Sequence, residues 1–190
     1  MKKLIITSSL ILLAACSTTQ VPLTYTPGPT AHTQGKPLAV VGEVKDSRKY
    51  TGTALGAIRG GFGNALKTLQ TEKPASEVIR TAIMDGLKSR GMAAAGNPKY
   101  VLDIDMIHFD CSQYVRREAH VELNVTLMDK AANKIVYERK VKADKVNGSV
   151  ITFDAGIFAS VEDLRKIANE ALQDAVDQLL NDPAFISKFN

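Results

Sequence analysis

Residues 114–128 alternate between apolar and polar side chains, and this pattern constrains the fold more than any other feature of the chain. The apolar positions are Ala119, Val121, Leu123, Val125 and Leu127, and the polar positions between them are His120, Glu122, Asn124 and Thr126. A period of two places one set of side chains on each face of a strand. One buried and one hydrated face are typical of an antiparallel sheet that is covered on one side.

Three further strands and two helices are predicted around this segment. Apolar and β-branched runs predict strands over 38–44, 100–109 and 135–146. The first helix is predicted over 74–90, where Pro74 suits the first turn and Gly91 the C-terminal end. The second begins at Ser160, which together with Asp163 resembles a capping box. We therefore expect an α+β fold of order β-α-β-β-β-α, a single mainly antiparallel four-stranded sheet with two helices on one face.

Residues 1–15 have the pattern of a secretory signal peptide. Two lysines precede an apolar stretch, 4–13, which is too short to cross roughly 30 Å of hydrocarbon as a helix. The stretch ends in Leu13-Ala14-Ala15-Cys16, which matches the lipobox of bacterial lipoproteins. We expect cleavage between Ala15 and Cys16 and acylation of the Cys16 thiol, which would anchor the chain to a membrane. An ordinary signal peptide with a chance cysteine is the alternative.

The residues after the cysteine predict a tether, a location and one globular domain. Residues 16–36 are rich in Ser, Thr, Pro and Gly and are expected to be a disordered tether to a domain over 37–190. Ser17 favours the periplasmic face of the outer membrane, because aspartate at that position retains enteric lipoproteins in the inner membrane. Removing Lys2 and Lys3 lowers the formal charge from +4 to +2, which gives no support for nucleic-acid binding.

The glycine-dense stretch from Gly52 to Gly63 is the candidate interaction site. From Gly61 onward it nearly spells a phosphate-binding loop, but Leu66 stands where the second glycine is required. A flexible or hairpin-like loop is the favoured interpretation. Its candidate contact residues are Ile58, Arg59, Gly60, Gly61, Phe62 and Gly63.

No catalytic, metal-binding or cofactor-binding pattern is favoured elsewhere. The polar strand face could bring together the carboxylates and imidazole of a hydrolase or a cation site, Asp103, Asp105, His120 and Glu122. Alternating polar residues are, however, what any hydrated strand face requires. His108 follows the alternation of Leu102 and Ile104 and is expected at a strand end or partly buried. Cys111 is expected to be a structural or incidental thiol, since no neighbouring base would activate it.

The chain is similar to the YajG-like family of uncharacterised bacterial lipoproteins. The similarity rests on the lipobox, the early strand, the segment from Ser76 to Gly91 and the final helix with Asp182-Pro183-Ala184-Phe185-Ile186, and covers most of residues 37–187. The layout of a helix-backed antiparallel sheet also resembles LptE-like envelope lipoproteins, which act as auxiliary subunits. Only Cys16 carries over as a functional residue, and the resemblance implies no known activity.

Together these features predict a non-enzymatic interaction or assembly module that is anchored by its acyl chains and binds an envelope protein. The alternative is a lipoprotein that binds a small ligand, a lipid or a glycan, either in a pocket between helix and sheet or on the polar sheet face.

Overall fold

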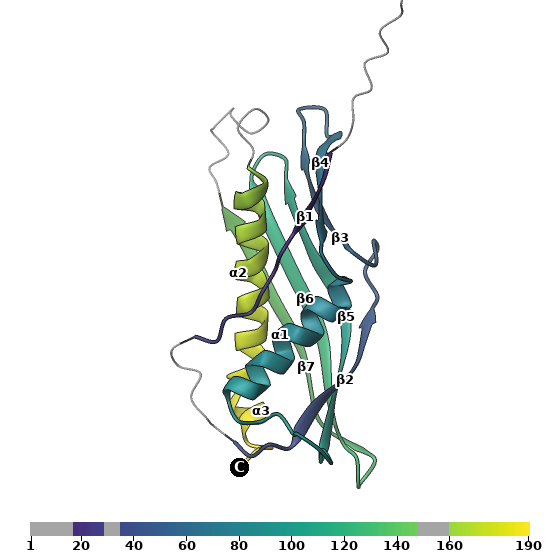
Figure 1. The fold of residues 1–190 in the computed structure, drawn as a ribbon, viewed down its shortest axis with the longest axis vertical. Coiled ribbons are helices and arrows are strands. Elements are labelled where there is room, and N and C mark those ends of the chain that lie inside the picture. Colours follow the sequence, from purple (N-terminus) through teal and green to yellow (C-terminus); the bar gives the residue numbers. More distant parts are fainter. Residues whose placement is uncertain (1–16, 29–34, 148–159) are drawn as a thin grey trace, which may run out of the picture.

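The computed structural model describes residues 17–28, 35–147 and 160–190, which form a sheet with helices on one side (Figure 1). The predicted signal peptide, the cleavage site between Ala15 and Cys16, and Cys16 itself lie outside the described residues.

Three long antiparallel strands form one half of the sheet. β5 (Tyr100–Gln113) pairs with β6 (Arg117–Asp129), and β6 pairs with β7 (Lys134–Asn147). The alternation in β6 has the predicted consequence, because the five alternating apolar side chains are buried, namely Ala119, Val121, Leu123, Val125 and Leu127.

A bulge in β5 changes which of its side chains face the core. The pairing with β6 shifts between Met106 and His108, so the alternation moves by one residue. His108 is therefore exposed, and Phe109 takes the next buried position. The expected strand-end or partly buried position for His108 is wrong for this reason.

Two parallel strands share the other edge of β5. β2 (Ala39–Asp46) pairs with its first half, and β3 (Ala54–Arg59) pairs with its last three residues. β3 turns back into β4 (Ala65–Thr71), and β1 (Ser17–Val21) pairs with β4 in parallel. Among the described residues the order is β1-β4-β3-β5-β6-β7, with β2 beside β5.

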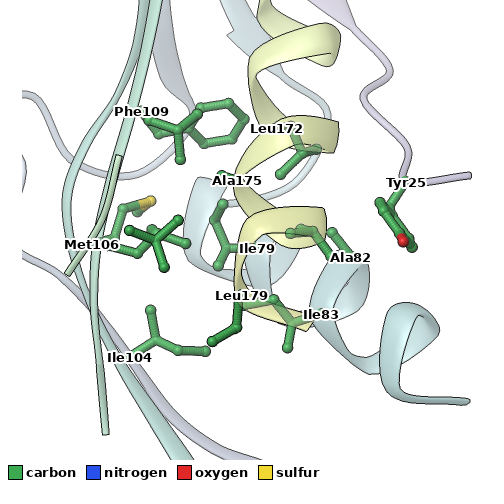
Figure 2. Close-up of a cluster of buried hydrophobic side chains, with 14 of the residues drawn as sticks. Tyr25, Ile79, Ala82, Ile83, Ile104, Met106, Phe109, Leu172, Ala175 and Leu179 are labelled. Carbon is green, nitrogen blue, oxygen red and sulfur yellow. The ribbon is translucent and has the colours of Figure 1, made fainter. Parts of the chain in front are cut away.

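The helices cover one face of this sheet. α1 (Ala75–Ser89) lies over β2 and contacts α2 (Val161–Leu180), which lies along β6 and β7 and leads into the short α3 (Pro183–Ile186). Side chains of both long helices point toward β5, and they fill the space between the layers (Figure 2). The predicted cap is present, since the Ser160 side chain accepts a hydrogen bond from the Asp163 amide.

The expected four-stranded, mainly antiparallel sheet with two helices is wrong. The described residues form a seven-stranded mixed sheet with three helices. The strands that were missed carry weak local patterns, because β1 is polar, β3 lies in the glycine-dense stretch and β4 directly follows it. Their strand conformation depends on pairing with distant residues, which local composition does not report.

Residues 17–28, which composition assigns to a disordered tether, are ordered against the domain. Val21 and Tyr25 are buried. The Tyr25 hydroxyl donates to Asp177 at 2.6 Å and accepts from the Arg90 guanidinium at 3.0 Å. The amides of residues 24 and 26 donate to side chains of α2. Ser17 is therefore fixed at the start of a paired strand.

Candidate functional site

The turn between β3 and β4 is held by its own hydrogen bonds. The Gly60 amide donates to the Asn64 carbonyl at 2.9 Å, and the Gly63 amide donates to the Gly60 carbonyl at 2.8 Å. Gly63 has φ +79°, a left-handed conformation that favours glycine. The Arg59 guanidinium also donates to the Gly63 carbonyl, at 3.0 Å. This turn leaves the Phe62 side chain fully exposed, with a relative accessibility of 102%.

A second turn lies against the first. Residues 114–116 connect β5 to β6, and the Tyr114 hydroxyl donates to the Gly61 carbonyl at 2.9 Å. Tyr114, Val115 and the nearby Leu66 of β4 all have exposed side chains. We call Phe62, Leu66, Tyr114 and Val115 the apolar tip. It lies at one end of the molecule, with the start of β1 (top of Figure 1).

The six residues of the predicted interaction loop fall into three environments. Ile58 is buried in the core, so it contacts the domain and no outside partner. Arg59 ends β3 and is exposed, while Gly60 to Gly63 form the turn around Phe62. Tyr114 and Val115 were missed by the sequence analysis, because their turn contains none of the residues that normally signal one.

The start of β1 lies close to this tip. Ser17 is paired with Lys67 of β4, which is in turn paired with Ile58 of β3. The exposed cations of this region, Arg59 and Lys67, form no ion pair among the described residues, whereas Arg116 is paired with Glu118 and Arg117 with Asp163. The tip is therefore an apolar surface beside positive charge.

The hydrated sheet face, opposite the helices, carries a second group of polar side chains. His120 Nδ1 lies 2.7 Å from Asp144, and the Lys140 ammonium donates to Glu122 at 2.8 Å. Lys142 also contacts Asp144, at 3.1 Å. Hydrogen bonds from Lys140 and from His120 hold the pKa values of Glu122 and Asp144, respectively, below their ordinary values. These charges compensate one another across and along the strands, as on an ordinary hydrated face.

The sheet does not gather the four residues considered for a hydrolase. Asp103 accepts from the backbone amide of residue 43 at 2.7 Å, and Asp105 accepts from the Ser47 hydroxyl. His120 and Glu122 instead pair with β7, as described above. In the part of the chain that the structure describes, no three His, Cys, Asp or Glu side chains are placed to hold a metal ion. These four residues therefore do not form an acid–base site in the described structure.

Cys111 lies on the core face of β5 and is 2% exposed. Burial raises the pKa of its thiol to about 12, which keeps it protonated at neutral pH. A thiol in this state is a poor nucleophile.

The fold and the site define a small α+β domain with one exposed apolar end and paired charges on its open sheet face. None of the helices in the described ranges is both long and apolar enough to span a membrane. A family model described as "uncharacterized lipoprotein" matches residues 26–189, and the chain belongs to this family. The comparison with curated proteins found no match.

Solved structures share the fold at low sequence identity. A crystal structure of a Xanthomonas campestris protein has a TM-score of 0.64 and 17% identity, over 90% of this chain and 97% of that one. A second crystal structure, of an uncharacterized protein, has a TM-score of 0.58 and 11% identity, over 87% and 97%. A candidate lipoprotein from Caulobacter crescentus reaches a TM-score of only 0.43, at 17% identity over 59% and 83%. The first two similarities establish the fold alone.

Proposed function

We propose that this lipoprotein is a non-enzymatic interaction module at the periplasmic face of the outer membrane. Acylated Cys16 would anchor it, and its apolar tip would bind another component of the cell envelope. The supporting observation is the exposure of Phe62 on a hydrogen-bonded turn, beside Leu66, Tyr114 and Val115. Single exposed apolar residues are ordinary, but a cluster on two connected turns is typical of a contact surface.

The alternative function, binding of a small ligand, a lipid or a glycan, has less support. The space between helices and sheet is occupied by buried side chains of α1, α2 and β5 (Figure 2). The hollow at the tip is a surface depression lined by the tip residues Tyr114 and Val115 and by their neighbours Ser112, Arg116 and Glu118. The polar sheet face has its charges in mutual pairs. An exposed tip therefore fits the structure better than a ligand pocket.

The proposal is tested by a photo-crosslinking side chain at position 62 of the full chain in living cells. The matched control carries the same group at position 135, because Ile135 is also apolar and 53% exposed. It is the second residue of β7, next to the β6–β7 turn at the other end of the molecule (Figure 1). We expect an adduct at position 62, with an envelope protein or lipid, that position 135 does not give. Equal or absent crosslinking at both positions would contradict the tip as contact surface.

The anchoring part of the proposal has a separate test. We expect the Cys16→Ser variant to leave the membrane fraction, since it offers no thiol for acylation. Retention of this variant in the outer membrane, at the level of the unchanged protein, would contradict anchoring through Cys16.

A further inference from the structure

We infer that the apolar tip inserts into the interface of the same membrane that holds the lipid anchor. This inference rests on the proposed function, because it takes Cys16 as the acylated residue. It names the envelope component that contacts the tip as a phospholipid surface.

No flexible linker separates the predicted lipid attachment point from the ordered domain. Consecutive Cα atoms are about 3.8 Å apart, so the Cys16 Cα must lie that close to Ser17. Ser17 itself is paired with Lys67, and the chain remains attached to the domain through Val21 and Tyr25. A lipid on Cys16 thus holds this end of the sheet at the membrane, whereas a disordered tether of twenty residues would have allowed any orientation.

The β3–β4 hairpin points past the start of β1. β1 and β4 are parallel, and Ser17 is level with Lys67. From Lys67 the chain continues back through Leu66 to the turn at Phe62, so the turn projects roughly 10 Å past that level, at about 3.3 Å per residue. A projection of this length, starting next to the lipid attachment point, reaches the bilayer interface.

The side chains of the apolar tip have the chemistry of a membrane-interface contact. Phe62 and Leu66 offer apolar surface, and Tyr114 has the amphipathic ring that is enriched at membrane interfaces, with its hydroxyl bonded to Gly61. Arg59 and Lys67 stand next to this surface without an ion pair among the described residues, as needed to attract anionic headgroups. An exposed aromatic residue would also suit a protein-binding site. The position of the tip beside the lipid anchor, however, favours a lipid surface as its partner.

The test uses tryptophan fluorescence, because the sequence contains no tryptophan. Phe62→Trp and the control Ile135→Trp each introduce a single reporter at an exposed position, so neither change disturbs the core. The acylated full chain is reconstituted into phosphatidylethanolamine and phosphatidylglycerol vesicles, with and without lipids brominated on their acyl chains. We expect the emission of Trp at position 62 to shift to shorter wavelength and to be quenched by the brominated lipid, while the control keeps its aqueous emission.

A quantitative arm uses Phe62→Ser in the Cys16→Ser background, where acyl anchoring no longer masks weak binding. Burial of a phenylalanine side chain in the membrane corresponds to about a tenfold to hundredfold increase in the partition coefficient of the protein between water and membrane. We expect Phe62→Ser to lower binding to the same vesicles by a factor in this range, and Ile135→Ser to leave it unchanged.

The outcomes separate this inference from the proposed function. An anchored, acylated chain whose Trp at position 62 remains unquenched would overturn the inference alone and would leave the tip to a protein partner. A chain that mass spectrometry shows to be unacylated, and that does not float with vesicles, would overturn both.

Discussion

The thiol of Cys111 illustrates how burial sets the behaviour of single residues in this chain. It lies where β3 meets β5, and the surrounding apolar side chains raise its pKa from an ordinary value of 9.0 to about 12. The neighbouring carboxylate of Asp110 adds to the shift. Between pH 9.0 and about 12, the Cys111 thiol therefore keeps its proton in the folded chain and releases it in the unfolded chain.

We expect the free energy of unfolding to fall as the pH rises from about 9 toward 12. The unfolded state loses the Cys111 proton near pH 9 while the folded state retains it, so folding becomes less favourable through this window. Urea unfolding at pH 8 and at pH 11 measures the change. Cys111→Ala should lose less stability over the same interval, although it is less stable at pH 8. An identical pH dependence in both proteins would contradict this assignment.

Among the secondary-structure elements, the β3–β4 hairpin depends on one close contact. A Cβ atom on Gly56 would lie 1.8 Å from the backbone oxygen of Cys111, so only glycine allows β3 to approach β5. The hairpin that carries the apolar tip is thus positioned by Gly56.

We expect Gly56→Ala to destabilise the protein by about 3 kcal/mol, because the clash is with backbone and cannot be relieved by a rotamer change. Gly61→Ala is the matched control, since a Cβ there meets nothing within 4 Å and should change stability by less than about 0.5 kcal/mol. Thermal unfolding of the two variants provides the comparison. A neutral Gly56→Ala would show that β3 does not pair with β5 as described.

The segment that precedes the domain is a structural element as well. Tyr25 is buried, and its hydroxyl joins Arg90 at the end of α1 to Asp177 of α2. Arg90 is itself almost fully buried, and its charge is partnered by Asp177 at 3.0 Å. The segment therefore contributes to the contact between the two helices.

We expect Tyr25→Ala to cost about 3 kcal/mol, through loss of the ring and of a partner for the buried guanidinium. Gly28→Ala, three residues further along, should be neutral within about 0.5 kcal/mol, because a Cβ there meets nothing. Denaturant midpoints of both variants are the measurement. A disordered tether would give two neutral substitutions, and that result would contradict the described packing.

Local patterns predicted those elements whose signal lies within their own residues. The alternation in β6, the cap of α2 and the position of α1 are all confirmed. β1 could not be predicted, because its strand conformation arises from a partner fifty residues distant, in the pairing of Ser17 with Lys67. β4 also pairs with the neighbouring β3, but its apolar residues do not alternate with polar ones. The bulge at His108 was equally hidden, since one extra residue changes the face without changing composition. At the candidate site the glycines around Phe62 were recognisable, whereas the turn of Tyr114 was not.

At the scale of the whole molecule, the arrangement separates two ends and two faces. One end combines the start of β1, the glycine turn and the apolar tip, while α3 and the β6–β7 turn lie at the other (Figure 1). One sheet face is covered by helices, and the charged side chains on the opposite face form ion pairs with one another. An anchor at Cys16 would hold the first end at the membrane and leave the paired charges of the sheet in the periplasm.

Intact-mass measurement of the native protein, extracted from the membrane fraction, tests the lipid anchor directly. We expect a mature chain that begins at Cys16 and carries the added mass of its acyl chains. A native chain that begins elsewhere, or one with an unmodified Cys16, would contradict it.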